Sequence, residues 1–344
     1  MDDLLLLTIL FGVLIIAGVS ARVRSTIITL PMLYTLFGLG VSFLLSDRSI
    51  SVDAQAVNLI GTLTLVLVLA SDASRIAFGN VAKHHDLPLR LLGIGLPLTI
   101  ALGTVITAVM FGGMGIWTAA ILAVILAPTD ASLGSSVVDN EKVPARIRQA
   151  LNIESGLNDG IAMPFLLLFI ALAASTSSLG SGEFVTTLLA QIGFGVLIGG
   201  ALGYLGAKYL AVAVQRGWMS PLFQKIAALA LVVIVYVLAE IVGGNGYIAA
   251  FSFGIVAGNT MAAASSLPLY EFGKTEYTLL MMVTYIFFGL IMLPQALANI
   301  SLTYILYAAL SLTVVRMLPV AISLLGARLQ MISVLFMGWF GPVS

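Results

Sequence analysis

The sequence predicts an all-α polytopic membrane protein. Of its 344 residues, 60% are hydrophobic and only 9% are charged, and the mean hydropathy is +1.13. Soluble domains carry about 25% charged residues. Apolar runs close to the roughly 20 residues that a helix needs to cross a hydrocarbon core recur along the whole chain. Because hydrocarbon offers backbone polar groups no water, these runs are expected to be helical.

Division of the apolar runs predicts about eleven complete spans and a shorter last one. In chain order the spans are Leu4–Ser20, Thr26–Leu45, Val57–Phe78, Leu89–Phe111, Trp117–Val138, Ala150–Ala174, Phe184–Val214, Leu222–Val242, Tyr247–Met261, Tyr277–Leu297, Tyr304–Leu325 and a segment from Ile332. The chain has no cysteine, which excludes disulfides and thiolate metal sites. Its zero net charge without a long basic run gives no indication of a nucleic-acid partner.

Basic residues predict the orientation of these spans. The loops after even-numbered spans contain only Arg48, whereas the odd-numbered loops and their flanks hold Arg22, Arg24, Arg75, Lys83, Arg90, Lys142, Arg146, Arg148, Lys208, Arg216, Lys225, Lys274 and Arg328. Cytoplasmic loops carry an excess of lysine and arginine. We therefore expect a cell (inner) membrane protein with its N-terminus outside and its odd-numbered loops in the cytoplasm.

A few charged residues fall inside predicted spans, where each costs about 2.5–3.5 kcal/mol on insertion scales and therefore needs a partner or a function. Four candidates lie well inside spans: Asp130, Glu154, Asp159 and Arg316. Asp72 lies in the cytoplasmic half of the third span, and Glu240 lies near a span end, where it can reach the interface.

The fifth span is predicted to be broken. Pro128, Thr129 and Asp130 lie near its middle, and proline removes a backbone donor and clashes with the preceding turn. Broken helices at membrane depth occur where freed carbonyls face a protein-lined cavity, and transporters use them to coordinate ions. The carbonyl of Thr129 could then bind a cation, with Asp130 compensating the positive end of the second half-helix. The alternative is a simple proline kink with Asp130 as an N-cap.

The sixth span carries the stretch NIESGLNDG. Ser155 and Asp159 are four residues apart and share one helix face, while Glu154 and Asn158 share the neighbouring face. One carboxylate can therefore belong to a structural ion pair while the other exchanges ligands. In the alternative, both carboxylates are structural and pair with arginines.

Arg316 is the basic residue deep inside a span, and we expect it to pair with Glu154. A pairing with Asp159 or Asp130 is the alternative, and it would suppress ion exchange at that carboxylate. In the seventh span, Gly195, Gly199 and Gly203 form a GxxxG series that permits close helix approach. We expect internal packing there, with a subunit contact as the alternative.

Five stretches together resemble one family: APTDASLG, VPARIRQALNIESGLNDG, YIFFGL, VVRMLPVAIS and LFMGWFGP. Along essentially the whole chain they are similar to the prokaryotic, NhaP-like sodium/proton exchangers of the monovalent cation:proton antiporter-1 family. The resemblance implies a fold of about thirteen helices with inverted repeats and broken, crossing helices. It also implies a homodimer.

The resemblance divides the chain into a peripheral first helix (1–25), a first inverted repeat (26–215, core spans 89–174) and an incomplete second repeat (216–344, core spans from about 302). The family continues beyond the GWFGP stretch with one more helix, whereas this sequence reads Pro342, Val343 and Ser344 and stops. We therefore expect the sequence to be truncated within the twelfth span.

The resemblance also implies roles for single residues. Asp159 would carry the proton or the cation, and Thr129 and Ser155 would help to coordinate Na⁺. Asp72 is the nearest match to a carboxylate that approaches the site from the third span. The remaining implied roles are structural: helix-crossing stabilisation by Asn158 and Asp130, and an ion pair of Glu154 with Arg316.

The expected function is electroneutral exchange of Na⁺, or of Li⁺ or K⁺, for H⁺, with both ions competing for Asp159. The expected partners are monovalent cations, protons, the lipid bilayer and a second copy of the chain, with no cofactor and no enzymatic activity. A cation or pH sensor that keeps the antiporter fold and a cation channel are the alternatives. An intramembrane protease is disfavoured because both histidines, His84 and His85, lie in a predicted loop.

Overall fold

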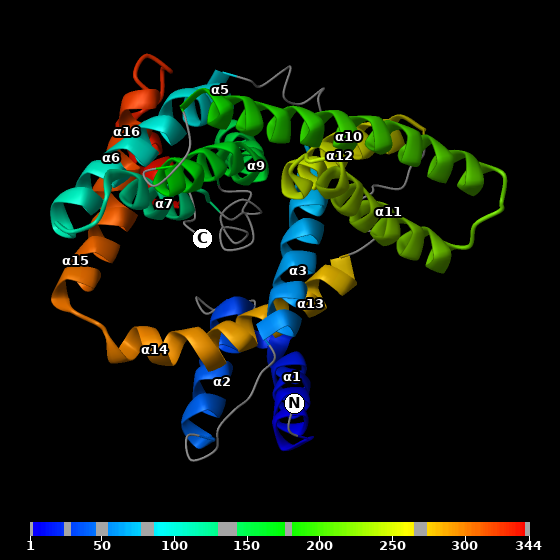
Figure 1. Cartoon of the computed structure of the whole chain (residues 1–344), viewed down its shortest axis with the longest axis horizontal. Helices are drawn as coiled ribbons and strands as arrows, with labels where there is room; N and C mark the ends of the chain where they lie inside the picture. Colours follow the sequence, from blue (N-terminus) through cyan, green and yellow to red (C-terminus); the bar gives the residue numbers. More distant parts are fainter. Residues whose placement is uncertain are drawn as a thin grey trace. The chain divides into compact units, whose positions relative to one another are not determined.

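A computed structural model describes residues 3–23, 29–45, 54–76, 86–129, 143–175, 181–264 and 274–340. Within these ranges the chain is built from helices joined by turns, without a strand, so the all-α prediction is confirmed (Figure 1). Seven of the described helices are long and apolar enough to cross a membrane. The helices form two compact units, one from Met1–Val68 with Gly273–Ser301 and one from Leu69–Phe272 with Leu302–Ser344.

The first unit joins the N-terminal helices to a helix from late in the chain. Its members are α1 (Asp3–Val23), α2 (Leu30–Leu44), most of α3 (Ala54–Ser74), α13 (Lys274–Phe287), the π-helical turn η3 (Phe288–Met292) and α14 (Leu293–Ala298). Two glycines bring its helices into backbone contact: a Cβ at Gly38 would overlap the carbonyl oxygen of Ile286, and one at Gly289 would overlap that of Thr35.

The second unit holds the predicted site. It contains the end of α3, α5 (Asp86–Arg90), η1 (Leu91–Gly95), α6 (Leu96–Met110), α7 (Ile116–Leu126), α9 (Ala145–Ser175), α10 (Ser181–Gln215), α11 (Pro221–Ile241), α12 (Gly246–Ala264), α15 (Leu302–Leu310), η4 (Ser311–Val315), α16 (Arg316–Ser323) and α17 (Met331–Phe340). These helices lie within or close to the predicted spans. The total number of spans stays a prediction.

Each of the three π-helical turns in the described residues precedes a proline. Pro97 and Pro294 occupy the second position of the helices that follow η1 and η3, and Pro319 lies inside α16 after η4. A proline cannot donate to the carbonyl one turn earlier. The wider π turn re-registers the backbone hydrogen bonds and lets the helix continue; in η1, for example, the amide of Leu96 reaches the carbonyl of Leu91.

The glycine series of the seventh span packs within the chain. A Cβ at Gly199 would overlap the carbonyl oxygen of Ala249, and one at Gly203 would lie 3.0 Å from the carbonyl oxygen of Phe253. α10 and α12 therefore touch along their backbones, as small residues allow in membranes. The prediction of internal packing is confirmed.

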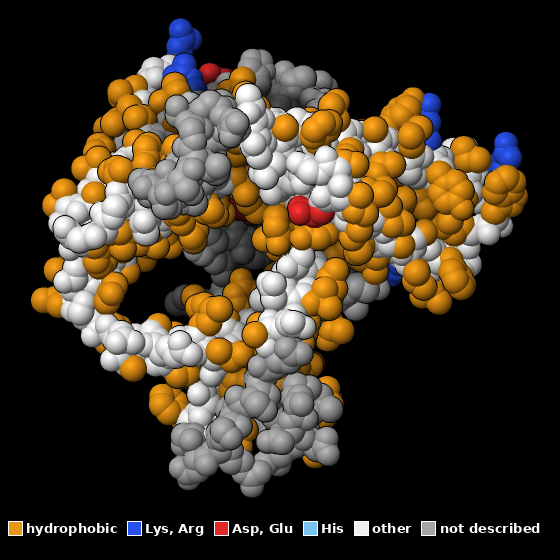
Figure 2. All heavy atoms as spheres, viewed as in Figure 1, with side chains coloured by type: hydrophobic (Ala, Val, Ile, Leu, Met, Phe, Trp, Pro, Cys, Tyr) orange, Lys and Arg blue, Asp and Glu red, His pale blue; other side chains and the backbone are white. Residues whose placement is uncertain are grey.

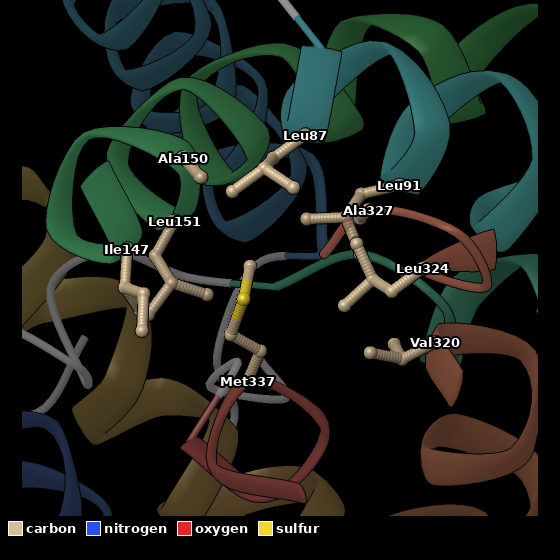
Figure 3. Packing of buried hydrophobic residues seen from close by; sticks show 9 residues of the cluster. All are labelled: Leu87, Leu91, Ile147, Ala150, Leu151, Val320, Leu324, Ala327 and Met337. Atoms are coloured by element: carbon tan, nitrogen blue, oxygen red, sulfur yellow. The ribbon is translucent and has the colours of Figure 1, made fainter. Parts of the chain in front are cut away.

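The second unit contains a cluster of buried apolar side chains (Figure 3). It draws side chains from α5, η1, α9, α16 and α17 and from the turn after α16: Leu87, Leu91, Ile147, Ala150, Leu151, Val320, Leu324, Ala327 and Met337. Burial of such side chains contributes about 1.5–3 kcal/mol each relative to water. The cluster joins the start of α9 to the end of α16, the two helices that carry Glu154 and Arg316.

Candidate functional site

The helix of the fifth span ends early. α7 stops at Leu126, and Pro128 and Thr129 continue the chain without helical hydrogen bonding. The interruption predicted from Pro128 is thus confirmed. Thr129 is completely buried. Asp130 lies outside the described residues, so its role in helix crossing stays a prediction.

Asn158 of α9 binds the residue at this break. Its side-chain Nδ2 donates to the backbone carbonyl of Thr129 at 2.9 Å and to the Thr129 hydroxyl at 2.6 Å. Only 1% of Asn158 is exposed, so these bonds form away from solvent. A buried carbonyl without a partner is costly, and the amide removes that cost where the helix can no longer supply a donor.

Ser155, one turn before Asp159 on α9, completes the polar cluster. Its hydroxyl oxygen lies 3.2 Å from the hydroxyl oxygen of Thr129. A hydroxyl has one donor and two acceptor lone pairs. Thr129 accepts from Asn158 and can donate to Ser155, which leaves one lone pair on each hydroxyl oxygen. Two neutral oxygens with spare acceptor capacity thus lie side by side, and oxygens of this kind suit hard cations.

Asp159 shares a helix face with Ser155, because the two residues are four apart on α9. Its side chain is partly buried. The end of α3 packs against the same turn: a Cβ at Gly156 would lie 3.3 Å from Cγ1 of Ile76 and 3.8 Å from the backbone oxygen of Asp72.

Asp72 is therefore carried on a segment that touches the α9 turn of Ser155 and Asp159. Its carboxylate lies 3.7 Å from Nε of Arg75, one turn further on, and both side chains are more than a third exposed. Whether its carboxylate takes part in ion binding stays a prediction.

Glu154 and Arg316 form a buried ion pair. Nη2 of Arg316 donates to Oε1 of Glu154 at 2.5 Å, and each side chain is 4% exposed. Arg316 is the first residue of α16, directly after η4. Among the described residues its carboxylate partner is Glu154, as the sequence predicts, and not Asp159. The two carboxylates of NIESGLNDG therefore lie in different surroundings.

One contact at the site was not predicted. The ring of Phe251 in α12 occupies the space where a Cβ of Gly160 would lie, and Gly160 directly follows Asp159. The sequence does contain a signal, because Gly156 and Gly160 are four residues apart and form a small-xxx-small pair on α9. The pair indicates a close neighbour, although it cannot identify Phe251.

Comparison with known proteins identifies the family. The model of the family described as sodium/hydrogen exchanger, transmembrane, matches residues 6–344. The chain belongs to this family. It is therefore a multi-pass membrane protein of a transporter family rather than of a classical enzyme family.

Curated relatives of this chain are named for two different cations. The K⁺/H⁺ antiporter NhaP of Alkalimonas amylolytica is 24% identical over 99% of this chain and 59% of its own length. The Na⁺/H⁺ antiporter ApNhaP of Aphanothece halophytica is 28% identical over 74% of this chain and 47% of its own length. The matches thus span about half to three-fifths of these relatives.

The fold of this chain is also found among solved structures. The sodium proton antiporter MjNhaP1 from Methanocaldococcus jannaschii, solved at pH 8, superposes with a TM-score of 0.76 at 19% sequence identity. The superposition covers 96% of this chain and 80% of that one. The chain thus has the same overall fold as this antiporter.

Proposed function

We propose that the protein exchanges a monovalent cation, Na⁺ or K⁺ or else Li⁺, for a proton, and that both ions compete for the carboxylate of Asp159. The observation that carries this proposal is the buried contact of the Thr129 and Ser155 hydroxyls on the Asp159 side of α9, at the end of a broken helix. Relatives named as Na⁺/H⁺ and K⁺/H⁺ antiporters support the same reading.

Competition at one carboxylate explains coupling. Asp159 becomes neutral when it binds a proton, and the site is also neutral when Asp159 binds a monovalent cation. A charged group is costly to move through a medium of low dielectric constant, so the two loaded forms cross and the bare anion does not. One cation then moves for each proton, and the exchange is electroneutral.

The other polar residues hold this site in place. Glu154 and Arg316 neutralise each other next to the site, so neither charge competes for the cation. Asn158 fixes the broken helix through Thr129 and leaves the remaining hydroxyl lone pairs for ligands. Asp130 is proposed to compensate the positive end of the second half-helix, and Asp72 to approach the site from α3.

We also propose the repeat organisation, oligomeric state and membrane orientation that the family resemblance implies. A peripheral first helix (1–25) precedes two inverted repeats (26–215 and 216–344), and a homodimer is formed. The protein lies in the inner membrane with its N-terminus outside. A rigid-body movement of the core helices would expose the site alternately to each side. Cations and protons are the only small partners in this proposal, and no cofactor is required.

Reconstitution tests the proposed exchange. The complete natural protein is placed in liposomes with an internal pH dye, a pH gradient is imposed, and Na⁺, K⁺ or Li⁺ is added with and without a potassium/valinomycin voltage clamp. We expect gradient collapse that depends on the cation and ignores the voltage. No collapse with any of the three ions, or collapse that follows the voltage, would contradict electroneutral exchange.

The substitution Asp159→Asn is the decisive variant. It keeps the size of the side chain and removes the charge that proton and cation share, so cation-dependent gradient collapse should fall to the level of empty liposomes. The matched control is Asp86→Asn, whose carboxylate is half exposed and pairs with Arg90 and Arg146; it should retain exchange. Exchange that survives in the Asp159 variant would remove this residue from the mechanism.

A further inference from the structure

The turn between α10 and α11 concentrates positive charge. Lys208 and Arg216 belong to α10 and its end, and Lys225 lies in the first turns of α11. Residues 184–239 contain no aspartate or glutamate. The turn and the helix ends next to it therefore carry three positive charges, and the nearest carboxylates in the sequence, Glu183 and Glu240, lie at the far ends of the two helices.

These three charges also differ in their pairing from four other basic side chains of the second unit. Arg75, Arg90, Arg146 and Arg316 each contact a carboxylate. Within the described part of the chain, Lys208, Arg216 and Lys225 have no such contact. Their charge is left for a partner outside the protein.

Aromatic rings accompany the basic groups. Nζ of Lys208 lies 4.3 Å from the centre of the Tyr204 ring, and the guanidinium of Arg216 lies 4.8 Å from the centre of the Trp218 ring. The side chain of Trp218 is 68% exposed. Tryptophan and tyrosine favour the headgroup level of a bilayer, and cation–π contact holds a basic group beside them.

The three charges lie within about 12 Å of one another along the helix axes. Arg216 is eight residues after Lys208, about 12 Å along a helix axis, and Lys225 is about 6 Å into α11 at 1.5 Å per residue. Lysine and arginine side chains extend further toward the interface. Figure 2 shows basic side chains beside hydrophobic ones at the end of the α10–α11 hairpin. The positive-inside rule assigns this end to the cytoplasmic leaflet, whose surface is negative.

We propose that the end of the α10–α11 hairpin binds the phosphate groups of anionic phospholipids. Arg216 presents a planar fork that matches two phosphate oxygens, and Lys208 and Lys225 act as flanking point charges. Trp218 and the exposed Leu222 and Phe223 pack against the acyl chains below the headgroup. This binding does not depend on the proposed exchange, because it uses none of the residues of the Asp159 site.

Tryptophan fluorescence can test the proposal at its own location. The chain has three tryptophans, so Trp117→Phe with Trp339→Phe leaves Trp218 as the single reporter. This variant is reconstituted into phosphatidylcholine vesicles with a minor fraction of phosphatidylglycerol, and either lipid is supplied in brominated, quenching form. We expect phosphatidylglycerol to quench Trp218 at least about two-fold more than its share of the lipid predicts.

Two controls accompany this measurement. The first is a triple substitution in the same single-tryptophan chain: Lys208→Gln, Arg216→Gln and Lys225→Gln. It should reduce the quenching of Trp218 by phosphatidylglycerol to the value that the share of this lipid predicts. Quenching by brominated phosphatidylcholine should stay constant, which shows that Trp218 still meets lipid. A second reporter chain that keeps Trp117 alone, at the other end of the bundle from this turn by the predicted topology, should show no preference for phosphatidylglycerol.

Three results would overturn the proposal. The first is quenching of Trp218 by phosphatidylglycerol that only matches its share of the lipid in the parent chain. The second is quenching above that share that the triple substitution leaves unchanged. The third is loss of the excess on addition of inorganic phosphate but not of chloride at the same ionic strength, since this would identify a site for free phosphate instead of a lipid headgroup.

Discussion

At the residue scale, disruption of the buried ion pair of Glu154 and Arg316 should lower the stability of the protein by a measurable amount. In Glu154→Gln the guanidinium stays buried without a counter-charge, and loss of one partner of a buried pair costs about 3–5 kcal/mol. We expect the free energy of unfolding, measured by denaturant titration of the detergent-solubilised protein, to fall by that amount.

The exposed pair of Asp86 with Arg90 supplies the comparison. Asp86→Asn should lower the free energy of unfolding by less than about 1 kcal/mol, because its side chain is 52% exposed and solvent screens the charge. A second test replaces both buried residues, as Glu154→Arg with Arg316→Glu, which should recover part of the loss. Equal stability of the Glu154 and Asp86 variants would show that the buried pair carries no structural role.

The hydroxyl of Ser155 is expected to act on cation affinity. Ser155→Ala removes one neutral oxygen beside Asp159 and leaves the carboxylate in place. A bond to a charged group contributes about 1.5–3 kcal/mol, which corresponds to an increase of about ten-fold or more in the KM for the cation. The measurement is the cation dependence of proton movement in proteoliposomes.

Ser323→Ala is the matched control for this prediction, because Ser323 is equally buried and its hydroxyl bonds to the carbonyl of Val320, away from the cluster. It should leave the KM unchanged. If the two serine variants had the same KM, Ser155 would not be a cation ligand.

At the scale of helices, the contact of α10 with α12 predicts opposite effects at neighbouring glycines. Gly199→Ala places a Cβ on the carbonyl oxygen of Ala249, a backbone atom that cannot rotate away, and should destabilise the protein by about 1–3 kcal/mol. Gly200→Ala meets no atom within 4 Å and should stabilise α10 by up to about 1 kcal/mol. Thermal unfolding of both variants checks the prediction, and equal transition temperatures would contradict the backbone contact.

Some features of the helices and of the site could be predicted from the sequence alone. Pro128 predicts the end of α7, and the spacing of Glu154, Ser155, Asn158 and Asp159 predicts the separate faces of α9, because both follow from helix geometry and proline chemistry alone. The Glu154–Arg316 contact was predictable because buried charges need partners.

Other features depend on three-dimensional packing. The prolines after η1, η3 and η4 do not by themselves predict a π turn, because a proline inside a helix is equally compatible with a simple kink. The ring of Phe251 reaches Gly160 across 91 positions of sequence, and no local pattern in either helix specifies that meeting.

At the scale of the whole molecule, the absence of cysteine offers a direct test of orientation. Gly113→Cys lies in the turn between α6 and α7, and Ser220→Cys lies before α11; both positions tolerate a thiol, since a Cβ at Gly113 meets nothing and the Ser220 side chain makes no cap bond. A membrane-impermeant maleimide should label Gly113→Cys in intact cells and Ser220→Cys only after permeabilisation. The reverse labelling pattern would contradict the proposed orientation and indicate the opposite one.

The glycine contacts of α12 limit where this helix can move. A Cβ at Gly254 or Gly258 would overlap the carbonyl oxygens of Ala70 and Ser74 on α3, so α12 meets α3 in the same backbone-to-backbone manner in which it meets α10. A carbonyl seated at each of these glycines resists axial sliding, because a slide of less than a full turn would bring the carbonyl against a neighbouring side chain. α12 is thus held against axial sliding on two sides, by α3 and by α10. Any piston-like displacement of α12 must therefore carry α10 and the end of α3 with it.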